Sequence, residues 1–264
     1  MLPRINKIVC NEADFLLFST NDVISSVLYN TGHWEQYIIE ISKFLIKEVD
    51  NPIVLDVGAN LGAYSIPIAK NICDIGGSVY GFEPQRIVYY QLCGNIILNR
   101  LDNYYAYNQA VGDFEGLIEI PEINYEKNHN IGAFSLNPAL RQQLNVEQYM
   151  LPSTSKISMI TLNRLELAHA PALIKIDVEG YELNVLKGAD EFLEKFNYPP
   201  LLFEVWDFDS FESARNNLLN YINYLGYKIS LNIRQEYVAQ HPKNSKYINF
   251  LLSPEGAVNM VREK

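Results

Sequence analysis

The chain has 264 residues, of which 21 are Lys or Arg and 31 are Asp or Glu, so its formal net charge is −10. This acidic balance argues against nucleic acid or an anionic membrane surface as a partner, because both are bound through clusters of Lys and Arg. Hydrophobic residues make up 48% of the chain, which excludes wholesale disorder and supplies a core. We therefore expect residues 1–264 to form a single domain.

The cysteines and the hydropathy pattern bear on the compartment. Cys10, Cys73 and Cys93 are an odd number with no C-x-x-C spacing, which is typical of free thiols in a reducing environment. The first residues lack the layout of a secretory signal peptide, and no apolar run is long enough to cross a bilayer. The sequence therefore predicts a cytoplasmic protein.

Hydrophobic spacing predicts alternating helices and strands from residue 33 to residue 113. Ile38, Ile41 and Leu45 recur at helical spacing, and short apolar runs next to Gly or Pro are typical of buried strands. This β-α-β-α-β order implies a parallel sheet with right-handed crossovers. The predicted elements are a helix at 33–49, a strand at 52–60, a helix at 61–72, a strand at 78–84, a helix at 87–101 and a strand at 104–113.

Residues 113–160 interrupt this order. Residues 113–123 alternate apolar and polar side chains as a β-hairpin does, and residues 124–138 are mostly polar. An insertion of this length that is rich in loop residues usually has a function. We therefore expect residues 113–160 to form a mobile flap over a binding site.

The regular order resumes after residue 172. The last two predicted strands follow each other without a helix, so we expect them to be antiparallel neighbours. The sequence thus predicts an α/β protein with a seven-stranded, mostly parallel sheet, helices on both faces and an inserted hairpin and loop. The remaining predicted elements are a strand at 173–180, a helix at 181–196, a strand at 200–206, a helix at 211–225 and strands at 227–232 and 247–253.

A glycine-containing turn follows the first predicted strand, in the stretch LDVGANLGAYS. In parallel sheets, ligands bind beyond the carboxyl ends of the strands. Gly58 allows backbone angles that other residues avoid and lets a ligand approach, and Gly62 allows the next helix to pack closely. Asn60 stands where a pyrophosphate-binding loop has glycine, and the phosphate-binding lysine is absent. The turn therefore predicts a ligand site without a pyrophosphate.

Two carboxylates narrow the ligand class. Asp56 ends the first strand and Glu83 ends the second, in YGFEP. A carboxylate in the place of Glu83 can accept hydrogen bonds from the two ribose hydroxyls of a nucleoside. Acidic strand ends favour an adenosine ligand with a positive group, such as S-adenosylmethionine (SAM). Ala110, after the third strand, is small enough to pack against the adenine.

The stretch ALIKIDVEGYE places three ionisable residues on a strand that is otherwise apolar. Side chains alternate along a strand, so Lys175, Asp177 and Glu179 share one face. A buried strand normally avoids unpaired charges, because each costs several kcal/mol. We therefore interpret Lys175 as the partner of a carboxylate and the two acids as site residues.

These stretches together resemble the FkbM-type SAM-dependent methyltransferases of the class I fold. The resemblance covers roughly residues 33–253 and implies transfer of a methyl group from SAM to a hydroxyl oxygen, with sugars or polyketide-type natural products as acceptors. Asn163 stands where an aspartate is more usual, and we expect it to be structural. The matching stretches are LDVGANLGAYS, VYGFEP, AVGD, ITLNRL, LIKIDVEGYELNVLKGA and LLFEV.

In such a fold the fourth strand lies beside the first, so its end faces the cofactor. Asp177 is then the first candidate for orienting SAM or the acceptor hydroxyl. Glu179 is the second, as a base or acceptor contact, although it could instead cap the following helix. His129, in the insertion, is a third base candidate.

Other interpretations remain open at this stage. Asp177 with Glu204 or Asp207 could hold a magnesium ion, but no His or Cys metal spacing is present and we expect no metal requirement. A nicotinamide-dependent oxidoreductase is disfavoured by the missing G-x-G-x-x-G pattern. A non-catalytic protein that keeps SAM binding is a further alternative. The sequence predicts a small-molecule or glycan acceptor and leaves its identity and the oligomeric state open.

Overall fold

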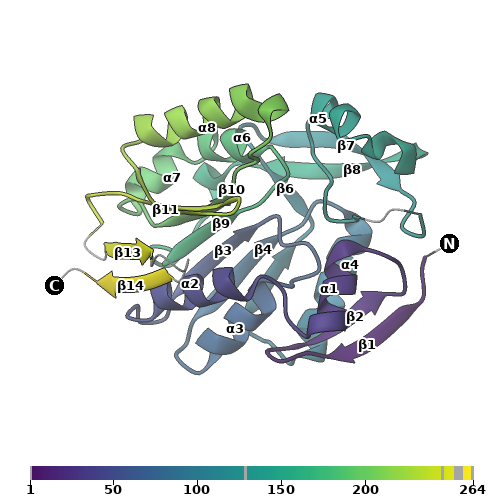
Figure 1. The fold of residues 1–264 in the computed structure, drawn as a ribbon, viewed down its shortest axis with the longest axis horizontal. Coiled ribbons are helices and arrows are strands. Elements are labelled where there is room, and N and C mark those ends of the chain that lie inside the picture. The colour runs from purple at the N-terminus through teal and green to yellow at the C-terminus, as the bar shows by residue number, and fades with distance from the viewer. Residues whose placement is uncertain (1, 128–129, 245–246, 253–257, 263–264) are drawn as a thin grey trace.

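A seven-stranded sheet forms the centre of the chain in the computed structural model, which describes residues 2–127, 130–244, 247–252 and 258–262 (Figure 1). The strand order is β11-β12-β10-β9-β3-β4-β5. The strand β12 is antiparallel to both of its neighbours, whereas the other neighbouring strands pair in parallel. The strands are β3 (Ile53–Val57), β4 (Ser78–Phe82), β5 (Tyr104–Tyr107), β9 (Leu173–Ile176), β10 (Leu201–Glu204), β11 (Lys228–Ile233) and β12 (Glu236–Gln240).

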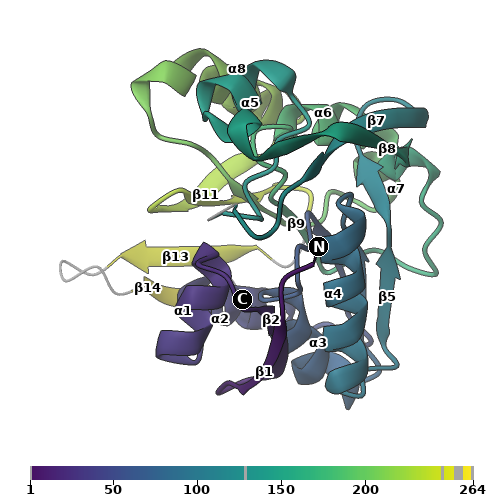
Figure 2. The same ribbon diagram turned by 90° about the vertical axis from the view of Figure 1, so that its right-hand side faces the viewer.

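Helices cover both faces of this sheet, as Figures 1 and 2 show. Side chains alternate along each strand, so Val54 joins the hydrophobic core on one face and Leu55 joins the core on the other. The predicted α/β fold class is therefore confirmed. One face carries α2 (Gln36–Ile46), α3 (Ser65–Cys73) and α4 (Arg86–Leu98), and the other carries α6 (Glu182–Lys187), α7 (Asp190–Lys195) and α8 (Glu212–Tyr224).

The N-terminal residues extend the packed core beyond the part that carries motifs. The hairpin of β1 (Ile5–Val9) and β2 (Asp14–Phe18) lies against α4, where Asn95 Oδ1 accepts from the backbone N–H of Leu16 at 2.6 Å. Phe15 and Leu17 are buried in the core, as is Leu28 of α1 (Val23–Thr31). The packed part of the domain therefore begins well before residue 33.

The segment 113–160 forms part of a small second sheet with strand order β6-β8-β7. The predicted hairpin at 113–123 is wrong, because the alternating residues form one strand, β7 (Gly116–Ile123), whose antiparallel partner is the distant β8 (Met150–Ile160). Alternation predicts a strand but does not identify its partner. The predicted strand 104–113 divides into β5 and β6 (Gln109–Val111), which belong to different sheets. Between β7 and β8 lies the short helix α5 (Pro138–Gln143).

The last strand of the central sheet along the chain is β12. The sequence predicted residues 247–253 as this strand, and that prediction is wrong. Residues 248–252 form β13 (Ile248–Leu252), which pairs with β14 (Val258–Arg262) in a separate two-stranded sheet, and residue 253 lies outside the described residues. The strand that was missed follows a two-residue turn without Gly, Asn or Asp, so the usual hairpin signal is absent. The last two strands of the central sheet, β11 and β12, are antiparallel as expected.

The predicted helix 181–196 is two short helices, α6 and α7, separated near Gly188. Asn163 has the structural role that we expected of it. Its side chain accepts from the backbone N–H of Phe192 at 2.9 Å and donates to Asp190 at 2.8 Å, so it holds the start of α7. All three cysteines are free.

Candidate active site

A cavity of about 260 Å³ lies at the carboxyl ends of β3, β4 and β9. Part of its wall comes from the insertion, through Gly132 and Phe134, and part from the N-terminal region, through Trp34. Gly62 does not line the cavity, and His129 lies outside the described residues. The sequence-predicted site residues that line it are Asp56, Gly58, Asn60, Glu83, Ala110, Asp177 and Glu179.

The turn after β3 is shaped by residues with positive φ. Gly58, Asn60 and Gly62 have φ values of 92°, 50° and 89°. A Cβ at Gly58 would lie 1.8 Å from the backbone oxygen of Asp177. Gly58 is therefore required for the close approach of two parts of the chain, in addition to the ligand approach that the sequence predicts. A Cβ at Gly62 would meet the side chains of α3 and α4, which confirms its predicted packing role.

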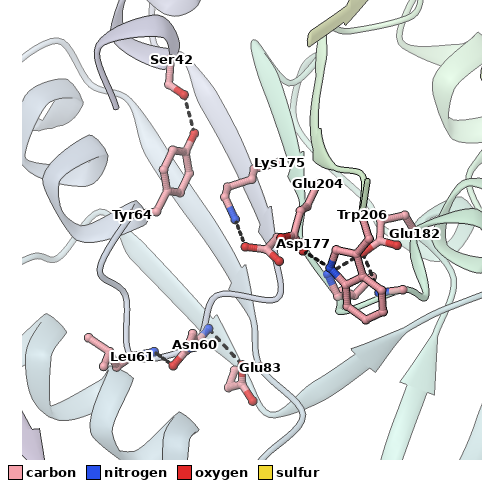
Figure 3. A network of polar contacts seen from close by, with 12 residues as sticks. Ser42, Asn60, Leu61, Tyr64, Glu83, Lys175, Asp177, Glu182, Glu204 and Trp206 are labelled. Carbon is pink, nitrogen blue, oxygen red and sulfur yellow. Dashed lines mark hydrogen bonds and ion pairs between the residues drawn. The ribbon is translucent and has the colours of Figure 1, made fainter. Parts of the chain in front are cut away.

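Glu83 links the two strand ends (Figure 3). Its Oε2 accepts from the backbone N–H of Asn60 at 2.9 Å, and its Oε1 accepts from that of Gln85 at 2.7 Å. Burial raises the pKa of Glu83 to about 8, although these two backbone hydrogen bonds act in the opposite direction. Each oxygen keeps a further lone pair, so the carboxylate can still accept from a diol in the cavity.

Asp56 is a buried carboxylate, 1% exposed, next to the cavity. Neither of its oxygens has a hydrogen bond of good geometry among the described residues, although the Ser65 hydroxyl is close enough to favour its charged form. Burial raises the pKa of Asp56, and the charge of Lys175, its cross-strand neighbour, partly offsets this rise. An unpaired buried carboxylate costs free energy, so this part of the wall favours a cationic or hydrogen-donating ligand.

Lys175 is 3% exposed and forms an ion pair with Asp177, with 2.7 Å between Nζ and Oδ2. Its Nζ also lies 5.2 Å from the centre of the Tyr64 ring. Burial opposes the charge of Lys175, but Asp177, Asp56 and Glu236 outweigh it and hold the pKa well above its usual value. The predicted pairing of Lys175 with a carboxylate is confirmed (Figure 3).

We expect Lys175→Met to lower the free energy of unfolding by about 2–3 kcal/mol, somewhat less than for a fully buried pair, because Asp177 is partly exposed. The substitution removes the ion-pair partner of Asp177 and the positive charge that partly offsets the burial of Asp56. Chemical denaturation of the variant measures the loss. Lys7→Met is the matched control, because it removes the exposed pair with Asp14 and should cost less than about 1 kcal/mol. Equal effects of the two substitutions would contradict the burial argument.

The loop after β9 differs from the predicted strand, which continued to Gly180. The strand β9 ends at Ile176, and Glu179 has φ 54°, an uncommon conformation for a residue other than glycine. Glu179 does not occupy the cap position of α6, because Tyr181 is the N-cap and no side chain caps the helix there. Glu182 instead holds the loop before the helix. Its Oε1 accepts from the backbone N–H groups of Val178 and Gly180, each at 3.1 Å. Glu179 faces the cavity, and burial together with Asp177 and Glu182 raises its pKa well above the usual value.

The motifs did not identify two further carboxylates in the cavity wall. Glu35 lies just before α2, and Glu236 begins β12 directly opposite Glu204. Neither lies in a recognisable motif, and the only signal for Glu236 was an acid at the start of the apolar stretch EYVAQ. The cavity is therefore richer in carboxyl groups than the sequence indicated.

The described residues contain no group of three or more His, Cys, Asp or Glu side chains placed to hold a metal ion. Of the two partners that the sequence offered to Asp177, Glu204 Oε2 accepts from Trp206 Nε1 at 2.9 Å. Asp207 pairs with Arg215 outside the cavity. Among the helices of the described residues, none has the length and apolar character needed to cross a membrane.

The central sheet and the cavity at its strand ends define an α/β protein with a ligand site of carboxyl groups. The chain belongs to the FkbM methyltransferase family, because the Methyltransferase FkbM domain matches residues 56–229. The predicted family is therefore confirmed.

Several known proteins are similar to this chain. A hexuronic acid methyltransferase, AglP of Haloferax volcanii, is 26% identical over 163 residues, which cover 60% of this chain and 59% of AglP. The structure of an FkbM methyltransferase from Methylobacillus flagellatus KT is 20% identical, with a TM-score of 0.47, and the match covers 72% of this chain and 43% of that chain. The structure of M. jannaschii TYW2 in complex with AdoMet is 17% identical, with a TM-score of 0.42, and the match covers 90% of this chain and 84% of that chain.

Proposed function

We propose that this methyltransferase moves a methyl group from SAM to a hydroxyl oxygen of a sugar or glycan residue. The observation that carries the proposal is the placement of Asp56 and Glu83, two buried carboxylates, in the wall of one cavity at neighbouring strand ends. A ligand with a diol and a positive charge satisfies both.

The residues present fit SAM. Glu83 would accept from the ribose hydroxyls, and Asp56 would face the positive part of the ligand, which supplies the hydrogen bonds and charge that its oxygens lack. Ala110 is buried, lines the cavity and would pack against the adenine. When bound, SAM supplies an activated methyl group on a sulfonium leaving group.

The chain's own part in the reaction is to position the acceptor and to receive its proton. Asp177 lines the cavity and is fixed by Lys175 through one oxygen, so the second oxygen can orient the acceptor hydroxyl. Glu179 is the second candidate. His129 stays a prediction, because it lies outside the described residues.

A sugar acceptor is supported by the similarity to AglP, which is a hexuronic acid methyltransferase. The test combines two measurements on the whole chain. Isothermal titration calorimetry should show binding of SAM and of S-adenosylhomocysteine (SAH). Incubation with SAM and sugar acceptors should then release SAH and add 14 Da, one CH₂ group, to the acceptor. Absence of SAM binding by the folded protein would overturn the proposal.

We expect Glu83→Ala to weaken SAM binding by about 1.5–3 kcal/mol, the range for hydrogen bonds to a charged group. The variant loses the acceptor for the ribose and also leaves the backbone N–H of Asn60 without its partner. Calorimetry with SAM measures the loss, and Glu119→Ala on the exposed face of β7 is the control.

A second ligand separates the ribose contact from general damage to the loop. Wild type should bind SAH more tightly than 2′-deoxy-SAH, whereas Glu83→Ala should bind the two equally, because the partner of the hydroxyl is gone. If the variant still discriminates between the two ligands as wild type does, Glu83 does not contact the ribose.

A further inference from the structure

A second cavity, of about 610 Å³, adjoins the first. The start of α2 and the turn between β11 and β12 form much of its wall. The two cavities have four lining residues in common: Trp34, Glu35, Glu204 and Glu236. A molecule in this outer cavity therefore lies against the wall of the inner one.

The outer cavity presents a cation in an unusual backbone position. Arg234 is the first residue of the two-residue turn between β11 and β12, and its φ is 58°. Hairpin turns usually place Gly, Asn or Asp at positive φ, so an arginine here is conformationally costly. Its guanidinium lies 5.0 Å from the centre of the Tyr37 ring. The turn and the ring together hold the guanidinium at the cavity.

Arg234 is exposed and forms no ion pair within the described part of the chain. The other Lys or Arg in the two cavity linings is Lys175, which Asp177 already engages. Arg234 is thus the cation in these walls that can take up an anion. The planar guanidinium presents two N–H groups that match the two oxygens of a carboxylate.

The acids around Arg234 do not cancel this preference. Burial, together with the neighbouring acid Asp177, raises the pKa of Glu204 to about 10. Burial also raises the pKa of Glu236 to about 8, although Lys175 opposes that rise. Burial raises the pKa of Glu35, with Lys175 and Arg234 acting against it. These shifts favour the protonated, uncharged forms of the three acids, which lessens the repulsion of an anion in the outer cavity.

We propose that the outer cavity is the acceptor subsite and that Arg234 binds the carboxylate of a hexuronate residue there. This proposal rests on the proposed function and names the class of sugar. The rings of Trp34 and Tyr37 line the cavity and offer flat apolar surfaces for a pyranose ring. Arg234 is a positioning residue, because a sugar held at its carboxylate is limited in how its hydroxyls face the inner cavity.

The experiment compares two sugars that differ in charge, methyl glucuronide and methyl glucoside. Calorimetry measures their binding to the full chain, with and without saturating SAH. We expect wild type to prefer the glucuronide, and Arg234→Gln to weaken glucuronide binding by about 10-fold to 100-fold without affecting the glucoside. Arg234→Lys should recover part of the affinity, because it keeps the charge but loses the planar fork.

Arg100→Gln is a closely matched control. Arg100 is also exposed, also has φ 58° and lies at the end of α4, outside both cavity linings. This variant should bind both sugars as wild type does. Thermal melting of all variants confirms that they fold.

Three results would overturn the proposal that the outer cavity is the acceptor subsite. Wild type could bind the two sugars with equal affinity, wild type could fail to bind the glucuronide, or Arg234→Gln could lose affinity for both sugars equally. A failure of the proposed function has a different signature. In that case SAH does not bind, and the sugar titrations without SAH still decide whether Arg234 selects the carboxylate.

Discussion

Gly58→Ala is expected to lower the free energy of unfolding by about 3–5 kcal/mol and to abolish measurable SAM binding. The new Cβ would lie 1.8 Å from the backbone oxygen of Asp177, a distance that no folded structure tolerates. Either the turn after β3 or the loop after β9 must therefore move. Both carry residues of the cavity wall, so the geometry of the site should be lost together with stability.

Gly32→Ala separates the clash from the cost of positive φ. Gly32 has φ 74° at the end of α1, and a Cβ there would meet the nearest atom, Asn11 Oδ1, at an ordinary 3.5 Å. This control should lose only about 1–2 kcal/mol and should keep its affinity for SAM. Urea denaturation and calorimetry on both variants measure the difference. Similar losses of stability and similar SAM affinity in the two variants would contradict the prediction. They would mean that the loops move apart and remove the clash between residue 58 and Asp177 without changing the site.

The sequence was informative about the central sheet and the cavity because both depend on local patterns. Strands β3, β4, β9 and β10 are short apolar runs, and each begins within one residue of its predicted start, although the prediction extended β9 as far as Gly180. The turn after β3 has an unusual backbone that glycine makes visible in the sequence. Glu83 and Asp177 lie where the carboxyl ends of parallel strands must meet, so their proximity followed from the topology.

One error comes from pairing across long stretches of sequence. The strand β7 was recognised by its alternation, but its partner β8 lies beyond α5, and no local signal connects them. The misplaced last strand has a different, local reason: the turn at Arg234 between β11 and β12 lacks the glycine that marks a hairpin.

The outer cavity could not be predicted for a related reason. Trp34 and Glu35 lie just before α2, whereas Arg234 lies in a turn near the other end of the chain. Each of these residues resembles an exposed polar or aromatic side chain when it is considered alone. Only the antiparallel pairing of β12 with β10 and β11 brings them to one wall.

Asp177→Asn is expected to lower kcat by about 10²-fold or more while it changes SAM affinity much less. Asparagine keeps the shape of the side chain but removes the charge that accepts a proton or orients the acceptor hydroxyl. The ion pair with Lys175 at 2.7 Å is also lost, so the melting temperature should fall. Initial rates with saturating SAM and acceptor, together with calorimetry for SAM, separate the chemical effect from binding.

Asp207→Asn is the control for the loss of one negative charge that is already paired with a cation. Asp207 follows β10, pairs with Arg215 and lies outside the cavity lining, so its variant should keep the kcat of wild type. Because Asp177→Asn is also less stable, rates must be compared well below the melting temperature of each variant. A kcat within a fewfold of wild type would move the role to Glu179, which faces the same cavity from the strained position with φ 54°. Glu179→Gln would then be expected to show the loss that Asp177→Asn lacks.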